Sequence, residues 1–229
     1  TWKTNLIGTG NLLDSLKFIK KKCVVIIVTS DKCYKIQKDK KIIFFKETDA
    51  LGGNDPYSAS KASSEIIFKS YYKSFLEKKK NLSIVSVRAG NIIGGGDWSK
   101  DRIIPDAIKS WVNGKILELK NPSSTRPWQH VLEPLLGYIL LAEKLFGNKQ
   151  RGFSTSWNFG PSRRTHIKVF KFAKILKSKM SSKSKLIVSK KSDNREKKNL
   201  DLDSKKANKA LGWKSFLSID GTLKLTADW

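Results

Sequence analysis

Residues 23–34, CVVIIVTSDKCY, decide the fold class, because six consecutive apolar residues lead directly into a polar turn. A continuous apolar run from Cys23 to Val28, rich in β-branched side chains, is typical of a strand buried on both faces of a parallel sheet. Ser30, Asp31 and Lys32 then follow the carboxyl end of this strand, where open α/β sheets bind their ligands. The stretch therefore predicts an α/β fold with a site at these three residues.

A second motif lies at the start of a helix that we expect from Tyr57 to about Lys79. The turn residues GGNDP at 52–56 lead into it, and Tyr57 and Lys61, four residues apart, share one helical face. A free phenol ionises only near pH 10, and a lysine charge about 5 Å away favours the phenolate by roughly 3 kcal/mol at an effective dielectric of about 20. The pair predicts a tyrosine base, although a core aromatic followed by a solvated lysine has the same spacing.

Expected helices and strands alternate along the rest of the chain. Before the glycines at 94–96 we expect a helix over 4–20 and a strand over 84–87. Beyond them the elements become shorter, with a strand near Leu117 and helices near 105–113, 134–146 and 167–177. This pattern predicts a partial Rossmann-type parallel sheet with helices on both faces, followed by a smaller mixed α/β lobe.

The formal charge of +26, from 46 basic against 20 acidic residues, would alone suggest nucleic acid or an anionic surface. The excess is nearly all lysine spread through loops and helix faces, so we interpret it as solvated surface and expect no specific nucleic-acid partner. No apolar run approaches the roughly 18 residues of a membrane helix, and we expect no membrane association. Cys23 and Cys33 are isolated, which favours a reducing, cytoplasmic compartment. We expect no metal site, and we interpret His130 as a packed structural residue.

Longer strings carry a resemblance to a known family. On these strings the chain resembles the NAD-dependent epimerase/dehydratase branch of the extended short-chain dehydrogenase/reductase family, and within it the CDP-glucose 4,6-dehydratases. The strings are TNLIGTGNLL at 4–13, VTSDKCY at 28–34, GGNDPYSASK at 52–61, RAGNIIGGGDW at 88–98, DRIIPD at 101–106, STRPWQHVLEPLLGY at 124–138, WNFGP at 157–161 and KANKALGW at 206–213. The resemblance implies that residues 1–95 are the C-terminal part of an NAD-binding Rossmann domain and that residues 96–229 are mainly a sugar-nucleotide lobe.

The same resemblance implies conversion of CDP-D-glucose to CDP-4-keto-6-deoxy-D-glucose by internal hydride transfer and loss of water, with NAD as the cofactor. Tyr57 would take the proton from the hydroxyl at sugar carbon four, Ser30 would bond that oxygen, and Lys61 would hold the nicotinamide ribose. Asp31 would be the acid for the departing water. Lys32 stands where relatives carry a glutamate base. It would be a neutral base or a charged group that stabilises the enolate, unless it is an ordinary surface lysine with no part in the reaction.

Further assignments also rest on the resemblance. The expected cofactor-binding residues are Ser30, Tyr57, Lys61 and Ala89, and the expected substrate-binding residues are Asn91, Arg102, Arg126 and Asn158. Each of the last four has a structural alternative, as a residue that leads into a helix for Arg102 and as a cap or turn residue for the other three. Arginine suits a nucleotide phosphate because its guanidinium bonds in bidentate fashion. Residues 194–196, Asn-Arg-Glu, stand where relatives tend to have His-Glu near the nucleobase. The helices over 4–20 and 57–79 are expected to pair with their copies in a homodimer.

Alternative functions remain at this point. Another sugar-nucleotide 4,6-dehydratase or epimerase, acting on dTDP-glucose, GDP-mannose or a UDP-sugar, would carry similar motifs. The Asp31–Lys32 pair argues against a simple epimerase, which needs no proton chemistry at carbon five. A non-catalytic Rossmann-like remnant is the third alternative, because no G-x-G-x-x-G turn follows a strand here. We therefore expect a fragment of a longer gene product that binds the dinucleotide poorly by itself.

Overall fold

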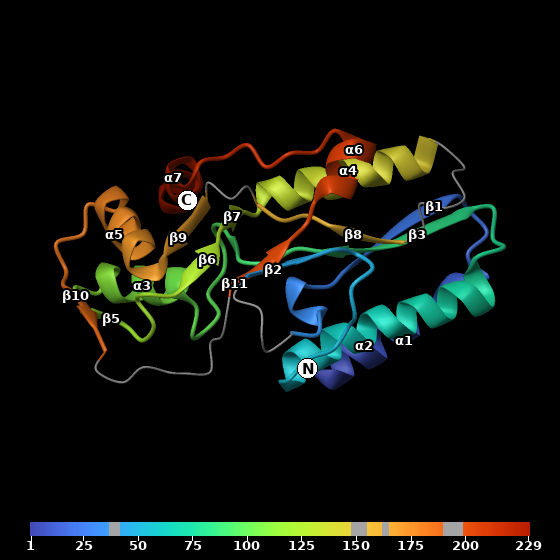
Figure 1. The fold of residues 1–229 in the computed structure, drawn as a ribbon, viewed down its shortest axis with the longest axis horizontal. Helices are drawn as coiled ribbons and strands as arrows, with labels where there is room; N and C mark the ends of the chain where they lie inside the picture. Colours follow the sequence, from blue (N-terminus) through green and yellow to red (C-terminus); the bar gives the residue numbers. More distant parts are fainter. Residues whose placement is uncertain (37–41, 148–154, 162–164, 190–198) are drawn as a thin grey trace. The chain divides into compact units, whose positions relative to one another are not determined.

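The computed structural model describes residues 1–36, 42–147, 155–161, 165–189 and 199–229 (Figure 1). The chain folds into two compact units, and it passes between them several times. The first unit comprises Thr1–Gly90, Pro134–Gly160 and Asp201–Lys214, and the second comprises Asn91–Glu133, Pro161–Leu200 and Ser215–Trp229. The first of these passages lies between Gly90 and Asn91, and the later returns of the chain were not anticipated. The expected boundary near residue 95 stays a prediction. The roles expected for the two parts stay predictions.

A three-stranded parallel sheet forms the centre of the first unit, in the order β1 (Cys23–Val28), β3 (Leu82–Arg88) and β8 (Ser156–Asn158). Val28 of β1 lies in register with Val87 of β3, which lies in register with Trp157 of β8. The apolar run at 23–28 thus forms the predicted strand, and the predicted parallel sheet is confirmed. Among the described strands, β1 pairs with β3 alone, and Val28 is exposed.

Helices cover both faces of this sheet, as predicted (Figure 1). On one face, Leu13 and Phe68 from two helices pack against Ile27 and Ile84 of the strands. On the other face, Phe146 lies near Val24. The elements concerned are η1 (Lys3–Ile7), α1 (Gly8–Ser15), η2 (Leu16–Phe18), α2 (Pro56–Tyr71), η4 (Tyr72–Leu76) and α4 (Leu132–Gly147), with α6 (Lys205–Leu211) further along the chain.

Helix α2 begins where its sequence signals place it. The Asp55 carboxylate accepts hydrogen bonds from the backbone amides of Tyr57 and Ser58, both at 3.0 Å, and thereby caps the helix. Pro56 occupies the first turn, where its missing N–H costs nothing. This cap fixes the start of α2 and thereby the point from which the Tyr57 side chain projects.

The second unit is a smaller mixed α/β body, as predicted. Its core contains Trp111, Trp128, Phe172, Leu176 and Leu223. Its helices are α3 (Ile103–Val112), α5 (Val169–Lys179) and α7 (Ile219–Asp228). Its strands pair in parallel as β4 (Ile92–Ile93) with β7 (Gln129–His130) and β5 (Leu117–Leu119) with β10 (Leu186–Val188), and antiparallel as β6 (Thr125–Pro127) with β9 (His166–Lys168).

One strand pair was not foreseen. The segment Ile42–Phe45, expected only as an apolar patch in a lysine-rich stretch, forms β2 and pairs with β11 (Asn199–Leu202).

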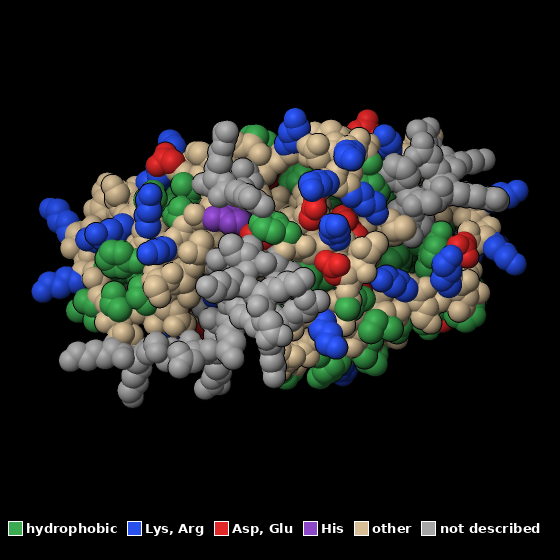
Figure 2. All heavy atoms as spheres, in the orientation of Figure 1, with side chains coloured by type: hydrophobic (Ala, Val, Ile, Leu, Met, Phe, Trp, Pro, Cys, Tyr) green, Lys and Arg blue, Asp and Glu red, His purple; other side chains and the backbone are tan. Residues whose placement is uncertain are grey.

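Lysine and arginine side chains are spread across the face of the molecule shown in Figure 2. Within the described residues, no helix is long and apolar enough to cross a membrane.

Candidate functional site

The polar turn after β1 is held by backbone bonds to the end of β3. The Thr29 amide donates to the Val87 carbonyl at 2.8 Å, and the Asp31 amide donates to the Ala89 carbonyl at 3.1 Å. The chain then makes one turn of 3₁₀ helix, η3 (Asp31–Cys33). Ser30 caps this turn, because its hydroxyl accepts a hydrogen bond from the Lys32 amide at 3.2 Å. The predicted site residues 30–32 therefore form a defined structure at the carboxyl edge of the sheet.

Asp31 is a buried carboxyl, with only 3% of its surface exposed. The Ser30 hydroxyl donates to its Oδ1 at 2.9 Å. A Cβ added to Gly90 would lie 2.2 Å from the Asp31 carboxyl carbon, so only glycine leaves room for this side chain. Burial raises the pKa of Asp31, against the opposing effects of the Lys32 charge and the bond from Ser30. A raised pKa is the direction of change that a carboxyl needs in order to act as a general acid.

Tyr57 and Lys61 lie on α2, which packs against η3. Tyr57 is 41% exposed, and within the described part of the chain its hydroxyl makes no hydrogen bond. Lys61 is half-buried, and its ammonium donates to the Val28 carbonyl at 3.2 Å. Burial lowers the pKa of Lys61, with a smaller opposing effect from the Cys33 thiol. The shared helical face is thus confirmed, whereas a direct effect of Lys61 on the phenol stays a prediction.

Lys32 is exposed, and its charge acts on Asp55 at the start of α2. The pKa of Asp55 shows this: burial raises it, but hydrogen bonds from Ser58 and the Tyr57 amide, together with the Lys32 charge, bring it below its ordinary value. The Lys32 charge therefore acts on the start of the helix that carries Tyr57.

The residues at this edge fit the nicotinamide end of a dinucleotide. A phenol, a serine hydroxyl and an ammonium supply donors and acceptors that suit ribose hydroxyls and a carboxamide. The Lys61 ammonium has three N–H groups, of which the Val28 carbonyl takes one. Ala89 is buried, and its carbonyl already accepts from Asp31, so its expected cofactor contact stays a prediction.

Of the four expected substrate-binding residues, Asn158 belongs to the first unit. It is fully buried, and its amide oxygen accepts from the Tyr34 hydroxyl at 2.7 Å while its nitrogen donates to the Phe45 carbonyl at 2.9 Å. These bonds favour a structural role for Asn158 and leave its expected contact with substrate a prediction.

The other three belong to the second unit. Asn91 adopts a left-handed backbone conformation, with φ of 50°, a strained state that is often found at binding sites. Arg102 is exposed and pairs with Asp97 at 3.6 Å. Arg126 is half-buried, and its Nη1 donates to the Thr125 carbonyl at 3.2 Å. Their contacts with a nucleotide stay predictions, and the expected nucleobase segment at 194–196 lies outside the described residues.

His130 is a packed residue, as interpreted from the sequence. It is buried, its Nδ1 accepts from the Leu132 amide at 3.4 Å, and burial lowers its pKa against the opposing charge of Glu133. Among the described residues, no cluster of three or more histidine, cysteine, aspartate or glutamate side chains is placed to hold a metal ion.

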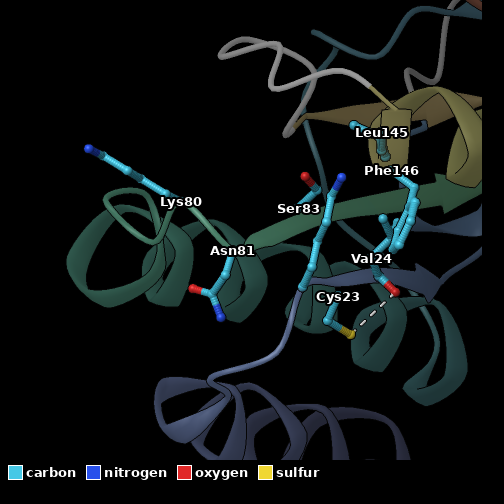
Figure 3. Close-up of a pocket in the computed structure, with 8 residues that line it drawn as sticks. Cys23, Val24, Lys80, Asn81, Ser83, Leu145 and Phe146 are labelled. Carbon is cyan, nitrogen blue, oxygen red and sulfur yellow. Dashed lines mark hydrogen bonds between the residues drawn. The ribbon is translucent and has the colours of Figure 1, made fainter.

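A small pocket lies at the other end of the sheet from Ser30 (Figure 3). Lys22, Cys23 and Val24, at the start of β1, form one side of it, and Leu145 and Phe146 of α4 form another. The Lys22 ammonium lies 4.4 Å from the centre of the Phe146 ring. The pocket is therefore separate from the polar edge of the sheet and contains none of the expected site residues.

The sequence interpretation missed two residues beside the site, Glu65 and Arg88. Both side chains are fully buried and form an ion pair at 2.7 Å. Two signals were present: Glu65 follows Lys61 by four residues on the same helical face, and Arg88 is the only charged residue of its strand, Leu82–Arg88. A charge at a buried position requires a partner, and this requirement could have prompted the search for one.

Known proteins are similar to this chain over most of its length. The family model for GDP-mannose 4,6 dehydratase matches residues 1–226. A CDP-glucose 4,6-dehydratase from Salmonella typhimurium is 37% identical over 233 residues, which cover 100% of this chain and 64% of the relative. A dTDP-D-glucose 4,6-dehydratase from Dictyostelium discoideum is 34% identical over 121 residues, covering 49% of this chain and 26% of the relative.

Solved structures share the fold. A UDP-glucuronic acid 4-epimerase from Bacillus cereus, in complex with UDP-glucuronic acid and NAD, superimposes with a TM-score of 0.80 at 20% identity, covering 99% of this chain and 67% of that one. A dTDP-glucose 4,6-dehydratase from Bacillus anthracis in complex with NAD gives 0.76 at 20% identity, covering 100% and 67%. The chain therefore spans about two thirds of the length of these relatives. With the family match over nearly all its residues, the chain belongs to the GDP-mannose 4,6 dehydratase family.

Proposed function

We propose that the full-length protein is an NAD-dependent nucleotide-sugar 4,6-dehydratase that converts CDP-D-glucose to CDP-4-keto-6-deoxy-D-glucose. The observation that carries the proposal is Asp31, a buried carboxyl with a raised pKa at the carboxyl end of β1. Loss of water needs an acid that protonates the departing hydroxyl, whereas epimerisation at carbon four needs no such acid. The 37% identity to the Salmonella enzyme supports CDP-glucose as the substrate.

In the first half of the reaction, the hydroxyl at carbon four becomes a ketone. Tyr57 accepts the hydroxyl proton, and the positive charge of Lys61 stabilises the phenolate that this role requires. The chemistry that NAD supplies when bound is the uptake and later return of a hydride. The Ser30 hydroxyl bonds to Asp31 in the structure. When Asp31 is protonated, its own O–H donates to Ser30, and this frees the Ser30 hydrogen for the sugar oxygen.

In the second half, the ketone makes the hydrogen at carbon five acidic, and water leaves from carbon six. Asp31 gives its proton to the departing hydroxyl. Two alternatives are open for Lys32: a neutral amine that takes the proton from carbon five, or an ammonium that stabilises the enolate. Lys32→Arg separates them, because arginine keeps the charge but does not act as a base. Activity in Lys32→Arg supports the charged role, and its loss together with that of Lys32→Met supports the base.

We also propose that the protein forms a homodimer through α1 and α2. Exposed apolar side chains lie on both helical segments. They are Ile7 at the end of η1 and Leu12 on α1, and Ile66 on α2 and Phe75 on η4. Hydrophobic side chains gather along the margin of Figure 2 that corresponds to these helices in Figure 1. Sedimentation of the full-length protein tests this: Ile66→Asp is expected to yield monomers, and a dimer that survives the change contradicts this interface.

A cytoplasmic location is part of the same proposal. It is supported by the state of the two cysteines, both of which are free. Burial raises the pKa of the Cys33 thiol to about 12, which makes this cysteine a poor nucleophile.

The experiment that tests the activity uses full-length protein with NAD and four substrates: CDP-glucose, dTDP-glucose, UDP-glucose and GDP-mannose. Mass spectrometry of the products is expected to show loss of one water from CDP-glucose with the highest kcat/KM. A product of unchanged mass and altered stereochemistry would favour the epimerase alternative. No conversion of any substrate would overturn the proposed function.

A further inference from the structure

A buried ion pair contacts the residues on either side of the turn that carries Ser30 and Asp31. Arg88, at the end of β3, donates from Nε to Oε1 of Glu65 at 2.9 Å and from Nη2 to Oε2 at 2.7 Å. Neither side chain is exposed. A bidentate pair of this kind has a fixed geometry. A buried pair contributes little net stability, because the cost of removing two charges from water offsets their attraction. Its position relative to the site is therefore the informative property.

The pair holds both ends of the turn that carries Ser30 and Asp31. At one end, the Thr29 hydroxyl donates to Glu65 Oε1 at 2.6 Å, and Thr29 directly precedes Ser30. At the other end, Arg88 Nη1 donates to the Tyr34 hydroxyl at 2.7 Å, and Tyr34 directly follows η3. The two charged side chains thus contact the residues on either side of the turn.

The pair also holds the helix that carries the other proposed catalytic groups. Glu65 follows Lys61 by four residues and Tyr57 by eight, so the three side chains lie along one stripe of α2. Because the Glu65 carboxylate is bound to β3 through Arg88, it fixes both the rotation of α2 and its position along its axis. The two halves of the proposed site are therefore tied to the same two side chains.

We propose that Glu65 and Arg88 are positioning residues, whose ion pair sets the turn at 30–33 against α2 so that Ser30 and Asp31 meet the same sugar as Tyr57 and Lys61. The inference rests on the proposed function. Neither residue touches the reacting atoms, so their loss displaces catalytic groups without removing any. A displacement of about 1 Å at a reacting group can cost roughly 10²-fold in rate. The effect is expected in kcat, with little change in KM.

Two hydroxyls in the same buried cluster provide a matched test. The Thr29 hydroxyl donates to Glu65 Oε1 at 2.6 Å, and the Ser86 hydroxyl donates to Glu65 Oε2 at 2.8 Å. The Val87 carbonyl oxygen lies 3.1 Å from the first hydroxyl, and Ser156 Oγ lies 2.9 Å from the second. Both residues are buried. Thr29→Val and Ser86→Ala therefore remove equivalent bonds from the same carboxylate, but only Thr29 adjoins the turn.

In the full-length enzyme, Thr29→Val is expected to lower kcat about tenfold or more with KM within about threefold, whereas Ser86→Ala keeps kcat within about twofold. Thr29→Ser restores the hydroxyl and is expected to restore kcat. Urea unfolding is expected to show similar losses of stability in Thr29→Val and Ser86→Ala. Equal losses of kcat in these two variants, or wild-type kcat in Thr29→Val, would overturn the inference, because the cluster would then act only through stability.

Hydrogen exchange gives a readout that does not depend on turnover. The amides of Asp31, Lys32 and Cys33 donate to the Ala89 carbonyl, Ser30 Oγ and the Ser30 carbonyl. Their exchange is expected to quicken in Glu65→Gln and Thr29→Val but not in Ser86→Ala, and unchanged exchange in Glu65→Gln would overturn the inference. If the wild type converts no nucleotide hexose, the proposed function fails, while the exchange pattern still decides whether the pair holds the turn.

Discussion

Replacing Gly90 by alanine tests how tightly the site is packed around Asp31. The added Cβ would lie 2.2 Å from both the carboxyl carbon and Oδ2 of Asp31. Carbon atoms in contact lie about 3.5–4.0 Å apart, so the carboxyl has to move by more than about 1 Å. Such a movement is expected to lower kcat by about 10²-fold. Overpacking of this kind also costs about 1–3 kcal/mol of stability.

The assay measures kcat and KM of the full-length enzyme with CDP-glucose, together with the urea midpoint of the same protein. Gly147→Ala is the matched control, because a Cβ at this exposed end of α4 meets no described atom within 4 Å. The control is expected to keep wild-type kcat. A Gly90→Ala enzyme with wild-type kcat would refute the reasoning, because Asp31 could then not be both confined by Gly90 and needed in place for catalysis.

Three further substitutions have defined outcomes. Asp31→Asn is expected to lower kcat by at least about 10²-fold, and to be more stable than wild type near neutral pH. The pKa of Asp31 in the folded protein lies above its ordinary value of 3.8, so the stability of the wild type falls as the pH rises from 3.8 to the folded-state pKa. The urea midpoints of the wild type and Asp31→Asn should therefore converge as the pH is lowered toward about 4. Tyr57→Phe is expected to abolish turnover with an unchanged urea midpoint, since the lost hydroxyl has no described partner; retained turnover would exclude Tyr57 as the base. Tyr138→Phe removes a buried hydroxyl without a described partner and should raise stability by up to about 1 kcal/mol, whereas a loss in thermal unfolding would indicate a bound water.

Local features of the site could be predicted from the sequence. The strand at 23–28 was predictable because six apolar residues in succession have few other arrangements in a short segment. The start of α2 was predictable because Asp55 and Pro56 are a cap and a first-turn residue that act on their immediate neighbours. Both signals depend on residues within a few positions of each other, so they do not require contacts with distant parts of the chain.

Features that depend on distant partners could not be predicted. The pairing of β2 with β11 joins segments about 150 residues apart, and neither segment carries a sign of the other. The burial of the Asn158 amide could not be predicted either, because its direction depends on Tyr34 and on the strand beside it, which place the amide in the interior. The Glu65–Arg88 pair was missed for the same reason, because its partners Thr29 and Tyr34 lie far from it in the sequence.

The most direct measurement of the central claim follows a deuterium label through one turnover. Full-length enzyme is incubated with NAD and CDP-glucose that carries deuterium at carbon four, and the product is analysed by NMR. If one site both oxidises carbon four and removes water with Asp31 as the acid, the label appears at carbon six of the 4-keto-6-deoxy product. A product without deuterium at carbon six, or full turnover in Asp31→Asn, would contradict the account.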